Sequence, residues 1–258
     1  MKYSILEDPR YSHLAKPKTP LLKFFSFLFD LYANTVLTFY TPVTVIGKEN
    51  IPRNEPFIFA SNHNSHMDIA VLVYATRLGY EHFGFLAAKD YWFDNNFRRR
   101  LFQNFINLIP IERTNNPESL DLEDTFTLAK AFVSRNNNIV IFPEGERGQA
   151  GVMKRFRKGA MRFSVGLNIP IVPAVISGTE DAWPRKTRFM KPVPITVEVL
   201  PPIYPEQFSD SEKRDYNKYL STQTKIMEEL ISERYAQLRA SNGAVSYTHL
   251  TLPTIYSV

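Results

Sequence analysis

Short apolar runs separated by polar turns recur along the chain, and they predict strands that alternate with helices. The run Pro56–Ala60 is bounded by polar residues and indicates a buried strand. Comparable runs lie at 43–46, 82–88, 107–111, 139–142 and 171–176, and a final strand at 195–200 completes the sheet. Helical spacing is clear between them, for example at Leu122, Phe126, Ala129 and Phe132. This alternation predicts an α/β fold, a single domain with a mostly parallel or mixed sheet flanked by helices.

The N-terminal part follows a different pattern. Residues 1–20 are polar and contain prolines, so we expect a flexible or peripheral lead-in. Residues 21–40 are strongly apolar, with one narrow polar stripe at helical spacing, formed by Lys23, Ser26, Asp30 and Asn34. We interpret residues 1–42 as a lead-in and a membrane-associated amphipathic helix whose aromatic face lies in lipid. A membrane-spanning helix and a helix packed in the core are the alternatives.

A histidine and an aspartate follow the strand at 56–60. His63 and Asp68 lie between this strand and a second apolar run, an order that predicts strand, turn and helix. A histidine can take a proton from an alcohol, and a carboxylate on its other ring nitrogen fixes its tautomer. Residues five apart do not share a helical face, so the pair requires His63 in the turn and Asp68 in the first helical turn. A helix cap, or a metal site with His66 as a further ligand, is the alternative.

Composition narrows the classes of protein. The chain has 258 residues, 44% hydrophobic and 22% charged, which is typical of a globular domain with a full core. The net charge of +5 suits anionic lipid surfaces or phosphorylated substrates, and no nucleic-acid-binding motif accompanies it. The chain contains no cysteine, which excludes disulfides and thiol catalysis and is consistent with a cytoplasmic setting.

A second sequence motif, which follows the strand at 139–142, narrows the interpretation of the first one around His63 and Asp68. The strand at 139–142 runs into Pro143, Glu144, Gly145, Glu146 and Arg147. Asn-His-x-Ser-x-x-Asp followed by Phe-Pro-Glu-Gly-x-Arg, in this order and separation, resembles the glycerolipid acyltransferase family, whose members include the 1-acylglycerol-3-phosphate (lysophosphatidate) acyltransferases. The resemblance covers about residues 43–205, and it implies the glycerol-3-phosphate acyltransferase-like fold.

The resemblance also implies roles for particular residues. His63 would act as general base on a lipid hydroxyl, and Asp68 would hold His63. The acceptor's phosphate and glycerol would be bound by four residues, Arg113, Glu144, Gly145 and Arg147. Around Arg113 the match is degenerate, because Asn107 and Pro110 replace a glycine and an aromatic residue. Glu144 has an alternative role in ordering its turn, and Glu146 replaces the family's usual threonine.

The reaction implied is transfer of a fatty acyl group from acyl-CoA or acyl-carrier protein to a lysophospholipid, with 1-acylglycerol 3-phosphate as the expected acceptor. No cofactor and no metal are needed, and the expected setting is the cytoplasmic face of a membrane. Another lysolipid or an amino-acid lipid as acceptor remains open. A lipid hydrolase and a non-catalytic lipid-binding relative are the other classes, although no Gly-x-Ser-x-Gly elbow is present.

The C-terminal part divides into a long helix and a short tail. The helix has an apolar face that includes Leu220, Met227, Leu230 and Leu238. Residues 243–258 resemble the translation of a sequencing-library adapter, so we expect a non-native tail there. The acyltransferase domain is therefore predicted to span residues 43–242.

Overall fold

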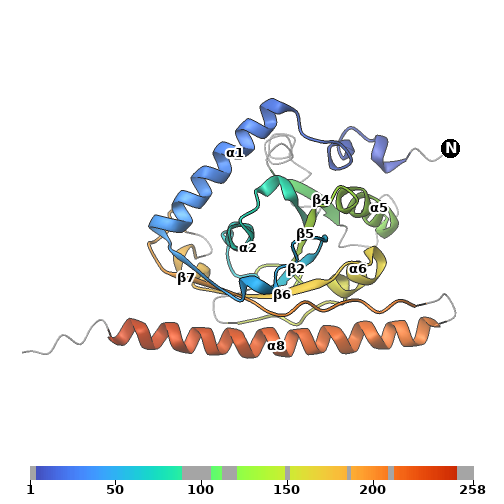
Figure 1. The fold of residues 1–258 in the computed structure, drawn as a ribbon. Coiled ribbons are helices and arrows are strands. Elements are labelled where there is room, and N and C mark those ends of the chain that lie inside the picture. The colour runs from blue at the N-terminus through green and yellow to red at the C-terminus, as the bar shows by residue number, and fades with distance from the viewer. Residues whose placement is uncertain are drawn as a thin grey trace, which may run out of the picture.

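A single sheet organises the computed structural model of the chain (Figure 1). The structure describes residues 4–88, 106–111, 121–148, 152–184, 187–208 and 212–248, and within them seven strands are arranged in the order β1-β7-β6-β2-β5-β3-β4. The strands are β1 Val43–Ile46, β2 Ile58–Ser61, β3 Phe83–Ala88, β4 Asn107–Ile111, β5 Asn138–Ile141, β6 Ile171–Ser177 and β7 Ile195–Val199.

The sheet is mixed. All neighbouring strands run parallel except β6 and β7, which are antiparallel. The central strands β2, β5 and β6 are buried along their whole length, which explains why their sequences are continuous apolar runs. The predicted α/β fold is confirmed. The last strand, β7, lies between β1 and β6 rather than at an edge of the sheet.

Helices cover both faces of the sheet. They are α1 Pro20–Thr35, which a π-helical turn continues over Val36–Tyr40, α2 Asp68–Thr76, α5 Leu122–Val133, α6 Gly159–Leu167, α7 Thr179–Ala182 and α8 Lys213–Thr248. Short 3-10 helices occur at Ile5–Glu7, Ser12–Leu14, Lys48–Asn50 and Tyr80–His82. Helices α5, α6 and α8 form a row of neighbours, and α2 lies on the other side of the sheet from α8 (Figure 1).

The lead-in is packed more closely than the sequence suggests. Tyr11 and Leu14 are fully buried, and the 3-10 helices around them contact α5. Arg135 donates hydrogen bonds from Nη1 to the carbonyl oxygens of Leu14 and Lys16. The expectation of a flexible or peripheral segment is therefore wrong for these residues, because two apolar side chains complete the core there.

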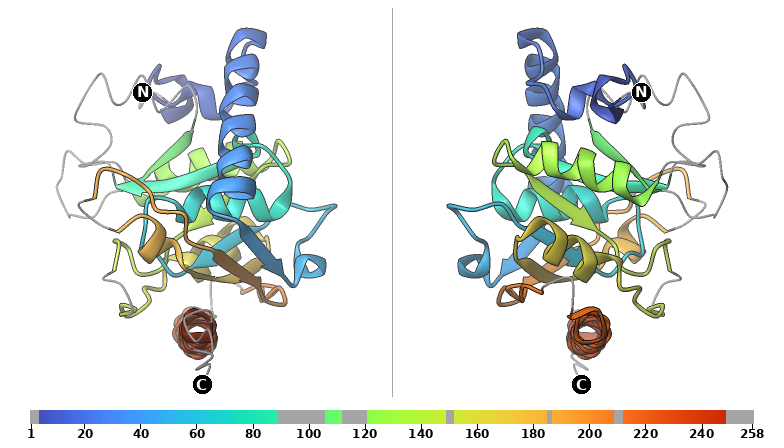
Figure 2. Two further views of the ribbon diagram at one scale, coloured as in Figure 1. Left: turned by 90° about the vertical axis from the view of Figure 1, so that its left-hand side faces the viewer. Right: turned by 90° about the vertical axis from the view of Figure 1, so that its right-hand side faces the viewer.

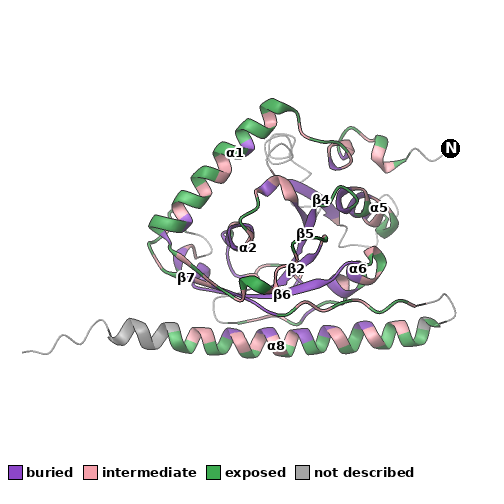
Figure 3. Ribbon diagram, viewed as in Figure 1, coloured by how far each residue is buried: buried purple, intermediate pink, exposed green. Residues whose placement is uncertain are grey.

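Helix α1 turns the middle of its polar stripe to the domain and most of its large apolar side chains to the outside, whereas Lys23 and Asn34 are exposed. Ser26 is buried beneath the helix, and Asp30 Oδ1 accepts a hydrogen bond from the backbone amide of Tyr80 at 3.0 Å. The exposed apolar side chains include Leu21, Phe24, Phe27, Leu31 and Tyr32. Figure 3 shows most of the α1 ribbon in the colour of exposed residues. Only 11% of the apolar window is buried, so the alternative of a core-packed helix is wrong.

Among the described residues, Pro20–Tyr40 is the one helical stretch long and apolar enough to cross a membrane. Figure 2 shows it on the side of the molecule away from α8.

Helix α8 packs its apolar face against β6 and α6. Leu220, Met227, Ile231 and Tyr235 are buried on this face, and Leu230 and Leu238 pack beside them. The backbone of α8 continues to Thr248, past the predicted boundary at 242. The assignment of residues 243–258 to a non-native tail stays a prediction.

Candidate active site

Two turns meet at the carboxyl ends of neighbouring parallel strands. Strand β2 leads into the histidine turn (residues 62–67), and β5 leads into the glutamate turn (residues 143–148). The backbone amide of His63 donates to Glu144 Oε1 at 2.8 Å, and the amide of Gly148 donates to the carbonyl oxygen of His63 at 2.7 Å. The pairing of β2 with β5 therefore brings together two motifs that are 81 residues apart in the sequence.

His63 and Asp68 contact each other at the start of α2. His63 Nδ1 lies 2.8 Å from Asp68 Oδ2, and the Asp68 side chain is fully buried. As the spacing required, His63 lies in the turn and Asp68 is the first residue of the helix. When Nδ1 donates its proton to Asp68, the basic atom of the ring is Nε2. The His63 side chain keeps 16% of its surface exposed, so the ring borders solvent.

The Asp68 carboxylate also holds the turn that carries His63. Oδ2 accepts hydrogen bonds from the backbone amides of Asn64 at 2.7 Å and Ser65 at 2.8 Å, and Oδ1 accepts one from Thr179 Oγ1 at 2.6 Å. Hydrogen bonds to a buried carboxylate stabilise its charged form. The same group therefore orients the imidazole and fixes the backbone around it.

The end of β6 and the start of α7 support the histidine turn from a third direction. Asn62 exchanges two hydrogen bonds with the backbone of Ile176, at 2.8 and 2.9 Å. Ser65 Oγ donates to the carbonyl oxygen of Trp183 at 3.0 Å. Sequence reasoning missed Thr179 and Trp183, because they lie more than a hundred residues from His63 and belong to no motif that it examined.

Glu144 points into the protein between the two turns. It is 2% exposed, and Oε2 accepts a hydrogen bond from the Lys154 amide at 2.9 Å while Oε1 accepts the one from His63. Burial raises the pKa of the Glu144 carboxyl, and the two amide donors partly oppose this. This geometry matches the turn-ordering role left open for Glu144, and its contact with substrate stays a prediction.

Ring stacking and a left-handed glycine shape the same turn. The rings of His63 and Phe142 are stacked, with centroids 3.8 Å apart. Gly145 has φ of +78°, and a Cβ there would lie 3.1 Å from Arg157 Nε. A glycine suits this position because a left-handed conformation disfavours other residues.

Two further charged side chains of the glutamate turn have partners. Arg147 Nη1 contacts His66 Nε2, and the Glu146 carboxylate pairs with Lys154 Nζ at 2.7 Å. The extra carboxylate of Glu146 is thus partly neutralised beside Arg147. Arg113, the other predicted phosphate ligand, lies outside the described residues.

The metal alternative finds no support in the geometry. The His66 ring contacts Arg147 and lies 5.9 Å from the Trp183 ring, while His63 turns toward Asp68. Within the part of the chain that the structure describes, no three histidine, aspartate or glutamate side chains converge as metal ligands do.

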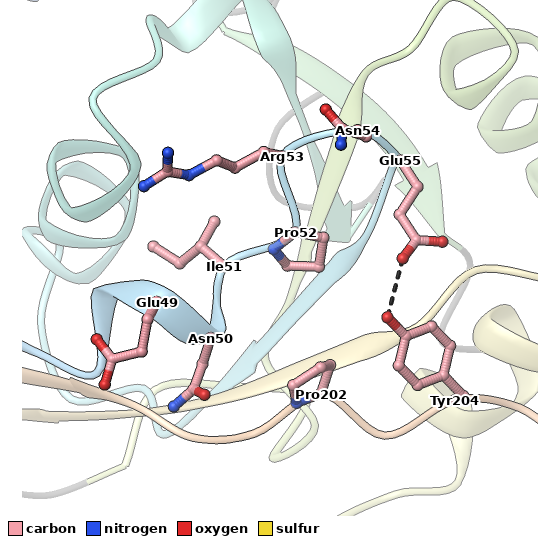
Figure 4. A pocket seen from close by; sticks show the side chains of 9 residues that line it. All are labelled: Glu49, Asn50, Ile51, Pro52, Arg53, Asn54, Glu55, Pro202 and Tyr204. Carbon is pink, nitrogen blue, oxygen red and sulfur yellow. Dashed lines mark hydrogen bonds between the residues drawn. The ribbon is translucent and has the colours of Figure 1, made fainter.

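The described cavities lie away from the His63 ring. One, of about 280 Å³, is on the loop before β2 at the opposite end of that strand, and it is lined by residues 49–55, Pro202 and Tyr204 (Figure 4). Figure 4 also shows the hydrogen bond from Tyr204 to Glu55, which spans 2.9 Å. Another, of about 270 Å³, lies between Met153 and α8, behind the histidine turn. The His63 ring itself borders solvent at the two turns.

Comparisons with known proteins agree with this arrangement. Residues 42–177 match the family model described as Acyltransferase, which is more than half of the chain. A 1-acyl-sn-glycerol-3-phosphate acyltransferase of Limnanthes douglasii is 27% identical over 179 residues, and one of Cocos nucifera is 30% identical over 178 residues. These alignments cover 69% and 68% of this chain, and 60% and 54% of the two relatives. The chain thus spans little more than half the length of these curated relatives.

A solved structure shares the fold. The crystal structure of the 1-acyl-sn-glycerophosphate acyltransferase of Thermotoga maritima superposes with a TM-score of 0.62 at 23% sequence identity. The match covers 85% of this chain and 81% of that chain.

Proposed function

The chain belongs to the acyltransferase family, and from this premise we propose that it transfers a fatty acyl group from an acyl thioester to the free hydroxyl of a lysophospholipid. The observation that carries the proposal is the His63–Asp68 contact of 2.8 Å at the end of a central strand, with the ring at the surface. The expected acceptor is 1-acylglycerol 3-phosphate, the substrate class in the names of the relatives. The donor is acyl-CoA or acyl-carrier protein.

The proposed reaction proceeds without an acyl-enzyme. His63 Nε2 takes the proton of the acceptor hydroxyl as its oxygen attacks the thioester carbonyl carbon. A carbon–oxygen bond forms, the carbon–sulfur bond breaks, and the imidazolium returns the proton to the leaving thiolate. The buried Asp68 carboxylate stabilises the imidazolium that exists between these steps. A base positioned in this way contributes about two to four orders of magnitude in rate.

Three backbone amides of the histidine turn are already engaged. Those of His63, Asn64 and Ser65 each donate to a carboxylate, as described above. The negative charge that develops on the carbonyl oxygen needs other donors, because an oxyanion site works through hydrogen bonds that are free to form in the transition state.

Basic side chains around the glutamate turn suit a phosphorylated acceptor. Arg147 lies beside the histidine turn, and Arg157 lies against Gly145. A planar guanidinium binds phosphate oxygens in pairs, which makes Arg147 and Arg113 the proposed ligands of the acceptor phosphate. Glu144 and Gly145 hold the turn from which Arg147 projects.

A lipid acceptor also requires access to a membrane, and α1 has the surface for it. Ser26 and Asp30 are turned inward, whereas aromatic and aliphatic side chains cover most of its outer side. An exposed apolar helix of this kind binds at the lipid interface or crosses the bilayer. We propose that the chain is attached to a membrane through α1, with the cytoplasmic face as its setting.

The test compares the purified chain with two histidine variants on liposomes. Labelled acyl-CoA and acyl-carrier protein serve as donors, and a panel of lysolipids that includes 1-acylglycerol 3-phosphate serves as acceptors. His63→Ala should lower kcat by about a hundredfold or more while the thermal unfolding temperature stays unchanged. His82→Ala is the matched control, because this half-exposed histidine lies beside Glu81, away from the two turns.

Each result has a distinct meaning. Product with 1-acylglycerol 3-phosphate that His63→Ala abolishes supports the full proposal. Product formed only with other acceptors supports the acyl transfer and contradicts 1-acylglycerol 3-phosphate as the acceptor. Lipid binding without transfer to any acceptor, unchanged in His63→Ala, overturns the enzyme proposal and leaves a lipid-binding relative.

A further inference from the structure

Helix α8 lies outside the residues that match the family model, yet one of its side chains contacts the histidine turn. Tyr235 is 4% exposed, and its hydroxyl accepts a hydrogen bond from Asn64 Nδ2 at 3.1 Å. Asn64 follows His63, and its backbone amide donates to Asp68. One residue therefore joins the C-terminal helix to the carboxylate that holds the histidine.

A buried carboxylate lies on the other side of this tyrosine. The Tyr235 hydroxyl donates to Glu180 Oε1 at 2.8 Å, and Arg239, one helical turn further along α8, lies 3.1 Å from the same oxygen. The backbone amide of Gly178 donates to Glu180 Oε2 at 3.0 Å. Glu180 is 2% exposed, so a buried charge is paired and hydrogen-bonded on both oxygens.

The hydrogen bonds from Asn64 through Tyr235 to Glu180 all run in one direction from donor to acceptor. A carboxylate only accepts hydrogen bonds, so the Tyr235 proton points to Glu180 and a lone pair of the hydroxyl faces Asn64 Nδ2. The Asn64 side chain is thereby fixed in one orientation. Because Asn64 is buried, releasing it would leave its amide group without this partner, which is costly.

We propose that Tyr235, Glu180 and Arg239 are positioning residues, which hold the histidine turn so that His63 and Asp68 stay in register. Glu180 reaches the pair by a second route as well, since its neighbour Thr179 donates to Asp68 Oδ1. Through this network α8 contributes to the geometry of the active site although it touches no reacting atom. Small displacements of a base relative to its substrate lower the rate of reaction.

Helix α8 also supplies a matched control. Arg234 forms an ion pair with Glu198 on β7, with a shortest separation of 2.5 Å. This contact also ties α8 to the sheet, and it does not touch the histidine turn. Arg234→Gln therefore removes an anchor of the helix without removing the positioning contact.

The experiment uses the full chain and three variants, Tyr235→Phe, Arg239→Gln and Arg234→Gln. Tyr235→Phe removes only the hydroxyl group from the buried part of the network. Arg239→Gln changes its partly exposed end, and it serves as a second test of the same network if Tyr235→Phe does not fold. Steady-state kinetics separate kcat from KM. Ring ¹⁵N shifts of His63, assigned by comparison with His63→Ala, report which nitrogen carries the proton. The kinetic part rests on the proposed acyl transfer, and the spectroscopic part does not.

The expected result is a loss in kcat of about tenfold or more in Tyr235→Phe, with KM within about twofold of wild type. The His63 ring shifts move toward a mixture of tautomers, Arg239→Gln changes both quantities in the same direction, and Arg234→Gln changes neither. The proposal is overturned if Tyr235→Phe has the kcat and the His63 ring shifts of wild type. It is also overturned if Arg234→Gln changes both quantities as much as Tyr235→Phe does. If the wild type transfers no acyl group, the proposed function fails, and the ring shifts alone decide the inference.

Discussion

At the scale of single residues, backbone conformation decides where the chemistry can be. Asp68 is able to contact His63 because His63 lies in a turn and the helix begins only at Asp68, five residues later. Within a continuous helix the two side chains would project to different faces. The glutamate turn has an equivalent requirement at Gly145, whose φ of +78° lies in the left-handed region.

Gly145→Ala is predicted to destabilise the protein by about 1–2 kcal/mol, because an L-residue pays strain in the left-handed conformation. The new Cβ also approaches Arg157, at 3.1 Å from Nε. Urea unfolding measures the change, and kcat should fall with it, since the glutamate turn holds the His63 backbone through Glu144.

The control for this prediction is Gly159→Ala. Gly159 is the first residue of α6, and a Cβ added there meets nothing within 4 Å. Alanine favours helix over glycine by up to about 1 kcal/mol, so this variant should be as stable as wild type or more stable. Equal stabilities of Gly145→Ala and wild type would contradict the role given to the left-handed turn.

At the scale of elements, α1 turns two polar side chains to the domain and most of its large apolar side chains outward. Ser26 and Asp30 face the domain, and Asp30 is held by the Tyr80 amide. Most aromatic residues of α1 face outward, where in water alone they would be unfavourable, and Phe29 packs inward against Tyr80. This orientation is explained if lipid covers the outer face, as proposed.

Phe27→Glu is predicted to weaken binding to anionic liposomes by about tenfold or more, because burying one phenylalanine contributes about 1.5–3 kcal/mol. Phe27 is 60% exposed, so the variant should unfold at the same temperature as wild type. Co-sedimentation with liposomes measures the binding.

Ile226→Glu is the matched control, because Ile226 is 47% exposed on α8, on the side of the molecule away from α1. Its binding to liposomes should equal that of wild type. Equal losses in the two variants would show that added negative charge, and not the outer face of α1, determines the result.

At the scale of the whole molecule, the N-terminal segment places a partly buried histidine, His13, against the fold. Burial and, to a smaller extent, the charge of Lys18 together lower the pKa of His13 from an ordinary value of 6.5 to about 4. Its Nε2 is buried without a hydrogen-bond partner in the described part of the chain. The folded state therefore holds His13 neutral at pH values where the unfolded chain protonates it.

The free energy of unfolding is predicted to fall as pH decreases from about 6.5 to about 4 through the contribution of His13. The sign follows because the unfolded state binds more protons in this range, so acid favours unfolding. Burial raises the pKa of Asp30, Glu144 and Glu180, and these carboxyls act in the opposite direction. The measurement is therefore the difference between wild type and His13→Gln in urea unfolding at several pH values.

The glutamine side chain of His13→Gln does not titrate. As pH decreases over this range, the free energy of unfolding should therefore fall by about 2 kcal/mol less in the variant than in wild type. Arg10 and Lys18 are unchanged in the variant, which keeps the surrounding charges the same. Parallel curves for the two proteins would show that His13 titrates alike in both states, and that it does not link the lead-in to acid stability.

By itself, the sequence determined the α/β order, the strand at each motif and the turn-and-helix placement of His63 and Asp68. These features are local, since they follow from apolar periodicity and from spacing within a few residues. Two motifs in order also identified the family that the comparisons show.

Only the tertiary structure decided how distant residues meet. It placed the carboxylate of Glu144 under the histidine turn, turned Asp30 of α1 toward the Tyr80 amide, and joined Tyr235 of α8 to Asn64. It also buried Tyr11 in a segment whose composition suggests a free lead-in. None of these contacts has a local signature, because strand order and helix packing select the partners of a buried polar group, often from more than a hundred residues away.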